Sequence, residues 1–187
     1  MIVATNNNGK INEIKAIFGD YEVFSLSDKN IKIEVNEDGN TFEENAVKKA
    51  KEVYEISKEP VLADDSGICI DILNGWPGVY THRFLGENVS DAERNQAIIE
   101  KMKNYSERER NASVVCEIAY YDGENLMVER GEIKGKISES RRGKNGFGFD
   151  EIFELNDGRT LAELSPKEKN RISARKIALE KLRERLR

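Results

Sequence analysis

The stretch Pro60-Val61-Leu62-Ala63-Asp64-Asp65-Ser66-Gly67 decides how the rest of the chain is interpreted. Its apolar residues, 61–63, are typical of a buried β-strand. The carboxylates that follow are costly at the end of an interior strand unless they are paired, hydrogen-bonded or bound to a metal. Mg²⁺ is held by one or two carboxylates together with phosphate oxygens. We therefore expect a strand that leads into a metal and phosphate site, with a simple polar turn as the alternative.

The composition limits the class of protein. The chain has 187 residues, of which 38% are hydrophobic and 35% charged, so one substantial core and a single domain over residues 1–187 are expected. No apolar run reaches membrane-spanning length and the first residues do not form a signal peptide, so a cytoplasmic protein without a membrane partner is expected. The net charge of −5 argues against a general nucleic-acid binder.

The cysteines and the histidine of this chain argue against a site built on thiols or on zinc. Cys69 and Cys116 each follow β-branched residues, and both are expected to be small buried hydrophobic residues. The only histidine is His82, which argues against a zinc site rich in histidine and is expected at the surface.

The N-terminal segment combines a short strand with a polar loop. Residues 2–4 are apolar, and the loop 5–10 leads into apolar residues at helical spacing. Free backbone amides at a helix start suit an anion, and Lys10 adds positive charge. A phosphate loop is predicted here, with an ordinary capped turn as the alternative.

A second helix start follows at Thr41, which forms a capping-box pattern with Glu44. The helix is expected to run to about Ser57. Short strands are expected at residues 22–26 and 31–35. Glu37 lies just before the helix and is either a metal ligand or a solvated turn residue.

The middle of the chain predicts further strands. Alternating isoleucines at residues 68–72 indicate a half-buried strand. Residues 112–121 and 126–137 are the longest strand candidates, and Asp122-Gly123 between them predicts a hairpin turn. Two glycines in the second of these strands suggest a bulge or bend.

Two more helices are predicted from their starts. Ser90 with Glu93 begins a helix expected to end near Tyr105. Pro166 begins a C-terminal helix that is expected to continue to Leu186.

Residues 141–150 form a basic loop rich in glycine that carries Phe147 and Phe149. Such a loop can stack a base and meet phosphates, whereas a surface hairpin with buried rings is the alternative. The residues 146–149 also resemble the stacking segment of an RNA-recognition domain. Asp150 stands where that domain needs an apolar residue, and the chain is acidic, so an RNA-binding module is disfavoured.

Taken together, several segments resemble the inosine triphosphate pyrophosphatase family, hydrolases of non-canonical purine nucleoside triphosphates. They occur in the family's order over nearly the whole chain, at residues 5–10, 39–46, 63–67, 75–80, 146–150 and 162–175. The resemblance implies an α/β fold that is elongated and two-lobed, with a long twisted mixed sheet flanked by helices and an active cleft between the lobes. It also implies hydrolysis of ITP, dITP and XTP to the monophosphate and pyrophosphate, Mg²⁺ as cofactor, and a homodimer.

The resemblance also assigns roles to individual residues. Asp65 corresponds to the catalytic base and metal-linked aspartate, Glu37 to a second metal ligand, and Asp64 to the same acidic cluster. The substrate-binding positions are Thr5, Asn6, Asn7, Asn8, Gly9 and Lys10 for the triphosphate, Ser66 as a further contact, Phe147, Gly148, Phe149 and Asp150 in the base-stacking loop, and Lys169 and Arg175 on the C-terminal helix.

The chain departs from the family pattern at three positions. Ala174 stands where the family has a histidine that reads the base, Phe149 where Tyr or Trp is common, and Asn6 where the phosphate loop has glycine. These departures keep two alternatives open. The first is a catalytically weak purine-nucleotide-binding protein, and the second is a related pyrophosphatase that acts on other modified nucleotides.

Overall fold

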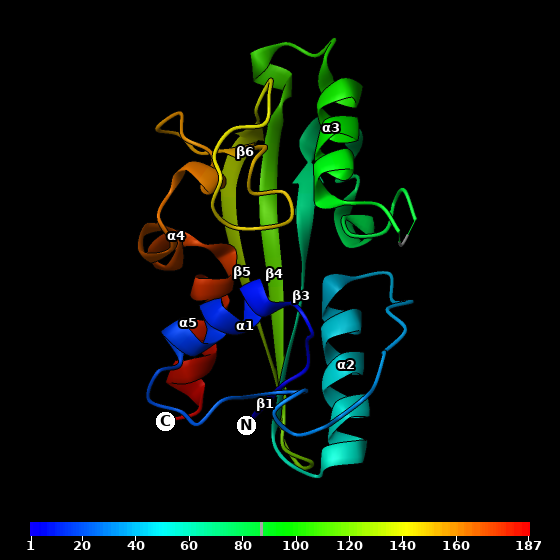
Figure 1. Ribbon diagram of the computed structural model, residues 1–187, viewed down its shortest axis with the longest axis vertical. Helices are drawn as coiled ribbons and strands as arrows, with labels where there is room; N and C mark the ends of the chain where they lie inside the picture. Colours follow the sequence, from blue (N-terminus) through cyan, green and yellow to red (C-terminus); the bar gives the residue numbers. More distant parts are fainter. Residues whose placement is uncertain (87) are drawn as a thin grey trace. The chain divides into compact units, whose positions relative to one another are not determined.

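The computed structural model describes residues 1–86 and 88–187 and shows a mixed α/β fold. Six strands form one sheet in the order β2-β1-β3-β4-β5-β6 (Figure 1). Strand β1 pairs in parallel with β2 and β3, while β5 pairs antiparallel with β6, so the sheet is mixed as expected. The strands are β1 (Ile2–Val3), β2 (Phe24–Ser25), β3 (Val61–Ile70), β4 (Asn111–Tyr121), β5 (Leu126–Ile137) and β6 (Phe153–Glu154).

The α-helices are α1 (Asn8–Ile17), α2 (Phe42–Ser57), α3 (Asp91–Met102), α4 (Pro166–Ile172) and α5 (Ala174–Arg185). Helices α2, α3 and α4 begin where their capping residues predict. Both expected capping boxes are present, Thr41 with Glu44 and Ser90 with Glu93, and each satisfies backbone amides of the first helical turn. None of the helices that the structure describes has the length and apolar character needed to cross a membrane.

The chain divides into two compact units, and strands β3, β4 and β5 each contribute residues to both. Unit 1 comprises Met1–Ser66, Cys116–Gly131 and Ser173–Arg187. Unit 2 comprises Gly67–Val115 and Glu132–Ile172. We describe each unit separately.

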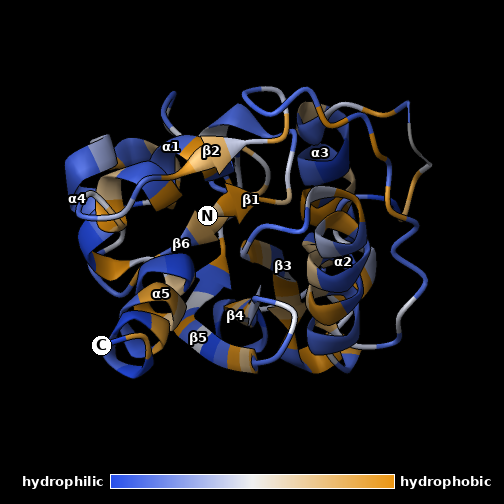
Figure 2. Ribbon diagram, turned by 90° about the horizontal axis from the view of Figure 1, so that it is seen from below, coloured by the Kyte–Doolittle hydropathy of each residue, from blue (hydrophilic) through white to orange (hydrophobic). Residues whose placement is uncertain are grey.

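Within unit 1, helices cover both faces of the strands. The strands β1 and β3, coloured as hydrophobic in Figure 2, lie between α2 on one side and the neighbouring helices α1 and α5 on the other. The α2 side is a core of small and branched side chains, comprising Ile2, Ala4, Leu26, Ala46, Ala50, Val53, Val61, Ala63 and Ala119. Strands covered on both faces are apolar in nearly every position, which makes any polar residue in them notable.

Strand β3 is longer than predicted. The expected end of the strand after Ala63 is wrong, because Val61–Ile70 is one continuous strand and nine of its ten residues are buried. The half-buried strand expected at residues 68–72 is also corrected: Ile68 and Ile70 are buried, whereas Ile72 lies in a short 3₁₀ helix and is exposed. The two carboxylates therefore lie in the middle of a buried strand.

Two other segments differ from prediction. Residues 31–35 form no strand, because β1 is two residues long and its pairing with β2 ends at Ser25. The apolar side chains of this segment still pack against the core on the α2 side. The C-terminal helix is broken at Ser173, whose backbone is extended and whose side chain accepts a hydrogen bond from the Lys176 N–H.

The cysteine prediction holds for one of the two thiols. Cys116 is buried, and this burial raises the pKa of its thiol to about 12. Cys69 is only partly buried, so the prediction is wrong for that residue. His82 is partly buried, which is compatible with the expected position at the surface or its rim.

Glycines in β5 permit close backbone approach, and the strand runs continuously over Leu126–Ile137. A Cβ on Gly131 would lie 1.9 Å from the carbonyl oxygen of Ala174, at the start of α5. Gly131 therefore allows the first turn of α5 to approach the sheet.

We predict that Gly131→Ala lowers the free energy of unfolding by about 1–3 kcal/mol, because the added methyl group must displace the backbone of α5. Chemical denaturation measures this loss. Gly19→Ala is the matched control, because a Cβ there meets only the Lys15 carbonyl oxygen at 3.9 Å. Equal stabilities of the two variants would contradict the prediction.

Candidate active site

The two aspartates of β3 face opposite sides of the sheet, because successive side chains of a strand alternate. The side chain of Asp64 contacts residues of α1 and α5, whereas that of Asp65 contacts α2. The two carboxylates are therefore adjacent in sequence but have different partners and different electrostatic environments.

Asp64 is the centre of a buried ion-pair network. Its Oδ2 accepts a hydrogen bond from Arg175 Nη2 at 2.8 Å and lies 3.0 Å from Lys10 Nζ. Arg175 also pairs with Glu13 through Nη1 and donates to Ser66 Oγ at 3.2 Å. All five residues are less than a tenth exposed, so the network is largely shielded from water.

The charges in this network stabilise one another. Burial alone would raise the pKa of Asp64, but Lys10, Arg175 and Lys49 outweigh it and hold that pKa well below its usual range. Burial alone would lower the pKa of Arg175, but Asp64 and the other anionic neighbours raise it above the usual value. Among the described residues, no partner hydrogen-bonds to the buried Oδ1 of Asp64.

Asp65 has a different environment on the α2 side. Its Oδ2 accepts from Asn45 Nδ2 at 2.8 Å, and its Oδ1 accepts from the Ser66 N–H at 2.9 Å. Burial raises the pKa of Asp65, Lys49 opposes this shift and Glu37 adds to it. The result is a carboxylate that is fixed in position and is a stronger base than an ordinary aspartate.

Lys49 connects Glu37 with β3. Its ammonium group donates to Glu37 Oε1 and to the backbone carbonyl of Asp64. Burial lowers the pKa of Lys49, but the charges of Asp64, Asp65 and Glu37 raise it overall. Lys49 therefore marks a position at which nearby carboxylates already favour a cation.

The donor set suits Mg²⁺ held jointly by protein and substrate. Within residues 1–86 and 88–187, no group of three or more His, Cys, Asp or Glu side chains is placed to hold a metal ion. Mg²⁺ does not need such a group, because it takes one or two carboxylates and completes its shell with water and phosphate oxygens. The oxygens of Glu37 and Asp65, both coupled to Lys49, fit that requirement.

The predicted phosphate loop is partly closed by its own side chains. The Oδ1 of Asn7 accepts from the N–H groups of Gly9 and Lys10 at 2.9 and 3.2 Å, and the Asn7 N–H donates to Thr5 Oγ1. The expectation that these helix-start amides are free is therefore wrong for Gly9 and Lys10. Asn6 and Asn8 have exposed side chains.

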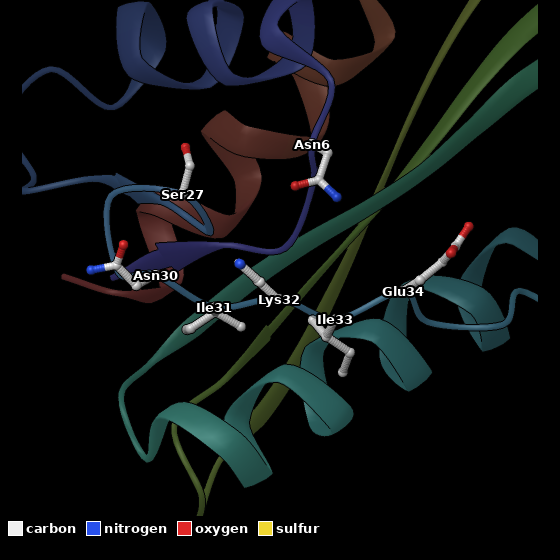
Figure 3. A pocket seen from close by; sticks show the side chains of 7 residues that line it. All are labelled: Asn6, Ser27, Asn30, Ile31, Lys32, Ile33 and Glu34. Carbon is white, nitrogen blue, oxygen red and sulfur yellow. The ribbon is translucent and has the colours of Figure 1, made fainter.

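A pocket of about 680 Å³ lies beside this loop. It is lined by Asn6, Ser27, Asn30, Ile31, Lys32, Ile33 and Glu34. Figure 3 shows the ammonium group of Lys32 directed toward the side of the pocket on which Ser27 and Asn30 lie. The pocket therefore adds hydrogen-bonding groups and two opposite charges, those of Lys32 and Glu34, next to the predicted phosphate loop.

In unit 2 the aromatic loop is held by its own aspartate. Asp150 Oδ2 accepts from the Phe147 N–H at 2.8 Å and from Lys169 Nζ. The Lys169 ammonium also lies 4.3 Å from the centroid of the Phe147 ring, a cation–π arrangement. Gly146 has a φ of +76°, and a Cβ there would lie 2.0 Å from Asp150 Oδ2, so only glycine allows this turn.

The next residues of the loop contact other elements of unit 2. Gly148 donates its N–H to Asp91 Oδ2 and accepts from Asn95 Nδ2, each at 2.8 Å. The rings of His82 and Phe149 are stacked, with centroids 6.3 Å apart. His82 thus belongs to the aromatic loop's surroundings.

The structure therefore gathers the predicted site residues into two groups. Unit 1 holds the phosphate loop together with Glu37, Asp64, Asp65, Ser66 and Arg175. Unit 2 holds Phe147, Gly148, Phe149, Asp150 and Lys169. Lys169 and Arg175, predicted on one helix, lie on α4 and α5.

Sequence reasoning missed five residues that complete these groups: Glu13, Asn45, Lys49, Asp91 and Asn95. In α1, the position of Glu13 between the buried residues Ile11 and Ile14 could have indicated that its charge is buried. A second indication existed in α2, where Asn45 and Lys49 are four residues apart on the face that carries Ala46 and Ala50.

We predict that Asp64→Asn lowers the free energy of unfolding by about 3–5 kcal/mol at neutral pH, because it takes from the buried Lys10 and Arg175 a carboxylate with which both are paired, and leaves Arg175 with the charge of Glu13. The native pKa of Asp64 is lowered, so its contribution is complete above the unfolded pKa near 3.8 and is lost as the pH falls below it. The stability difference between wild type and variant should therefore shrink on acidification.

Urea denaturation from pH 7 to pH 3 measures this difference, with the exposed Asp71→Asn as control. A stability difference that is small at pH 7, or that grows on acidification, would contradict the assignment of Asp64 as the buried counter-ion.

Comparison with known proteins agrees with the resemblance seen in the sequence. A profile of the Ham1 family matches residues 1–185. A dITP/XTP pyrophosphatase of Clostridium perfringens is 43% identical over 195 residues, covering 99% of this chain and 96% of the relative. A protein of the same name from Bacillus subtilis is 42% identical over 97% of this chain and 93% of its own length.

Solved structures show the same similarity. The Staphylococcus aureus Ham1 protein matches with a TM-score of 0.87 and 38% identity, covering 99% of this chain and 96% of that one. A HAM1 protein from Coxiella burnetii matches with a TM-score of 0.88, also at 38% identity, over 99% of this chain and 96% of its own. The chain therefore belongs to the Ham1 family.

Proposed function

We propose that the protein hydrolyses non-canonical purine nucleoside triphosphates, ITP, dITP and XTP, to the nucleoside monophosphate and pyrophosphate. The observation that carries the proposal is the cluster on β3, in which a fixed carboxylate with a raised pKa lies beside buried cations. The family relatives named dITP/XTP pyrophosphatases support the same activity.

Binding of the triphosphate uses the cations of unit 1. A nucleoside triphosphate carries several negative charges, and Lys10, Lys49 and Arg175 are positive groups that the protein already holds in place. Charges fixed in a site that excludes water stabilise developing negative charge without reorganising. Asn6 and Lys32, at the neighbouring pocket, add an amide and an ammonium group beyond the ion pairs, although Glu34 also lines that pocket.

The metal requirement follows from the carboxylates around Lys49. Glu37 and Asp65 would hold Mg²⁺, with Asp64 Oδ1 as a further buried acceptor in the acidic cluster. When bound, Mg²⁺ neutralises phosphate charge and polarises the phosphorus that is attacked. The protein's own part is to hold these carboxylates in fixed positions through Asn45 and Lys49.

Asp65 is the proposed general base. Its two oxygens are oriented by Asn45 and by the Ser66 N–H, so the carboxylate can accept the proton of an attacking water without first reorienting. Its raised pKa increases its affinity for that proton. Attack at the α-phosphorus releases pyrophosphate, whose negative charge the neighbouring cations stabilise.

Recognition of the base is assigned to the aromatic loop. Phe147 and Phe149 provide ring surfaces for a purine, and Lys169 provides a cationic donor. A 6-oxo purine accepts a hydrogen bond at the position where adenine presents an amino group, so a cationic donor there remains unpaired with ATP. Ala174, buried at the start of α5, supplies no imidazole for this step.

The family resemblance further supports a single catalytic domain, a cytoplasmic location and a homodimer for this chain. Sedimentation equilibrium on the purified protein tests the dimer. The alternative, a nucleotide-binding protein with weak catalysis, is favoured only by Ala174, and turnover distinguishes it from the enzyme.

We predict that the purified protein with Mg²⁺ releases pyrophosphate from ITP, dITP and XTP at least about a hundredfold faster, in kcat/KM, than from ATP. Separation of nucleotide products by chromatography and a pyrophosphate assay measure this ratio. Tight binding of ITP without turnover would support the weakly catalytic alternative. Equal rates on ITP and ATP would remove the proposed specificity while leaving a hydrolase.

We predict that Asp65→Asn lowers kcat by about 10²- to 10⁴-fold, because the amide cannot accept the proton of water. The circular dichroism spectrum should not change, since the amide keeps the shape of the carboxylate. Asp71→Asn, an exposed aspartate on the 3₁₀ helix that follows β3, is the control and should keep the wild-type rate. A normal rate in Asp65→Asn would exclude Asp65 as the base.

A further inference from the structure

The peptide groups of Gly148, between the two rings of the aromatic loop, are clamped by a single helix. The Gly148 N–H donates to Asp91 Oδ2 at 2.8 Å, and its carbonyl accepts from Asn95 Nδ2 at 2.8 Å. Asp91 and Asn95 are four residues apart on α3 and therefore lie on the same face of that helix. One turn of α3 thus holds both the donor and the acceptor of one loop residue.

The remaining contacts leave the loop little freedom to move at other points. Gly148 has a φ of +61°, so its backbone is in a conformation that side chains rarely adopt. Asp150 and Lys169 hold Phe147 on one side of it, and the His82 ring stacks on Phe149 on the other. The α3 clamp is the contact that acts on the backbone between the rings.

We propose that Asp91 and Asn95 are positioning residues for purine binding. By fixing Gly148, they determine the directions in which the rings of Phe147 and Phe149 project. A loop that already has its bound conformation loses less conformational entropy when the base stacks on it. This inference rests on the proposed function, since it names residues that prepare the base-binding loop.

The two residues should not contribute equally. Asn95 is 2% exposed, so loss of its amide leaves the carbonyl of Gly148 without its donor in a region that water reaches poorly. Asp91 is exposed, and water can replace much of what its carboxylate provides. Asn95 is therefore expected to be the more important of the pair.

The test compares isosteric variants of α3. Asn95→Asp keeps the shape of the side chain but removes the donor, and Gln96→Glu makes the same chemical change at the exposed neighbour as a matched control. Asp91→Ala removes the acceptor, and Asp91→Asn restores one. The two Asp91 variants change an exposed residue, so they remain informative if Asn95→Asp folds poorly.

We expect Asn95→Asp to raise the KM for ITP and the Kd for IMP about tenfold, and Asp91→Ala to raise both less. The inhibition constant of pyrophosphate should stay at the wild-type value, because the phosphates are assigned to the cations of unit 1. Hydrogen exchange of residues 145–151 should accelerate in both variants. Asp91→Asn and Gln96→Glu should behave as wild type.

Unchanged KM, Kd and exchange in the folded variants would overturn the inference, as would an equal rise in the pyrophosphate inhibition constant. Failure of the proposed function is separate, because it appears as wild-type protein that does not hydrolyse ITP. The Kd for IMP and the exchange rates would then still decide whether α3 positions the loop for a purine.

Discussion

The buried ion pair between Asp64 and Arg175 is the interaction on which the candidate site depends. The two residues are 111 positions apart in the chain, and burying either charge is costly unless it is paired with an opposite charge. Their pairing requires that the first turn of α5 reach β3, which Gly131 permits and the cap at Ser173 directs. Lys10 and Glu13 then complete the network from α1, so one ion pair ties both helices to the central strand.

Because successive side chains of β3 point to opposite faces of the sheet, its two aspartates have different electrostatic environments. The side chain of Asp64 faces Lys10 and Arg175, and these two cations together with the charge of Lys49 hold its pKa low, so it stays ionised and organises positive charge. Asp65 faces the α2 side, where burial raises its pKa and Glu37 adds repulsion. Asp64 is therefore a structural anion, whereas Asp65 is a carboxylate suited to proton transfer. The alternation of side chains along the strand is sufficient to produce this difference, without any change in backbone conformation.

In unit 2, polar contacts from a few residues likewise hold the aromatic loop. Rather than many apolar contacts, a few hydrogen bonds from Asp91, Asn95 and Asp150 hold the backbone around the rings. Glycines at 146 and 148 make this possible, because the loop backbone adopts positive φ at both. The backbone on either side of the rings is therefore held in place by these hydrogen bonds.

Capping residues, the two adjacent aspartates and the ordered motifs were sufficient in the sequence to predict the starts of α2, α3 and α4, most strands and the family. These features are local, since each depends on residues a few positions apart. The sequence did not show that β3 continues through its polar residues, nor that Glu13 and Lys49 join the site, because those outcomes depend on partners supplied by α1, α2 and α5. Only the tertiary structure decided which charges are paired, since the stability of a buried charge depends on groups that are distant in the chain and close in space.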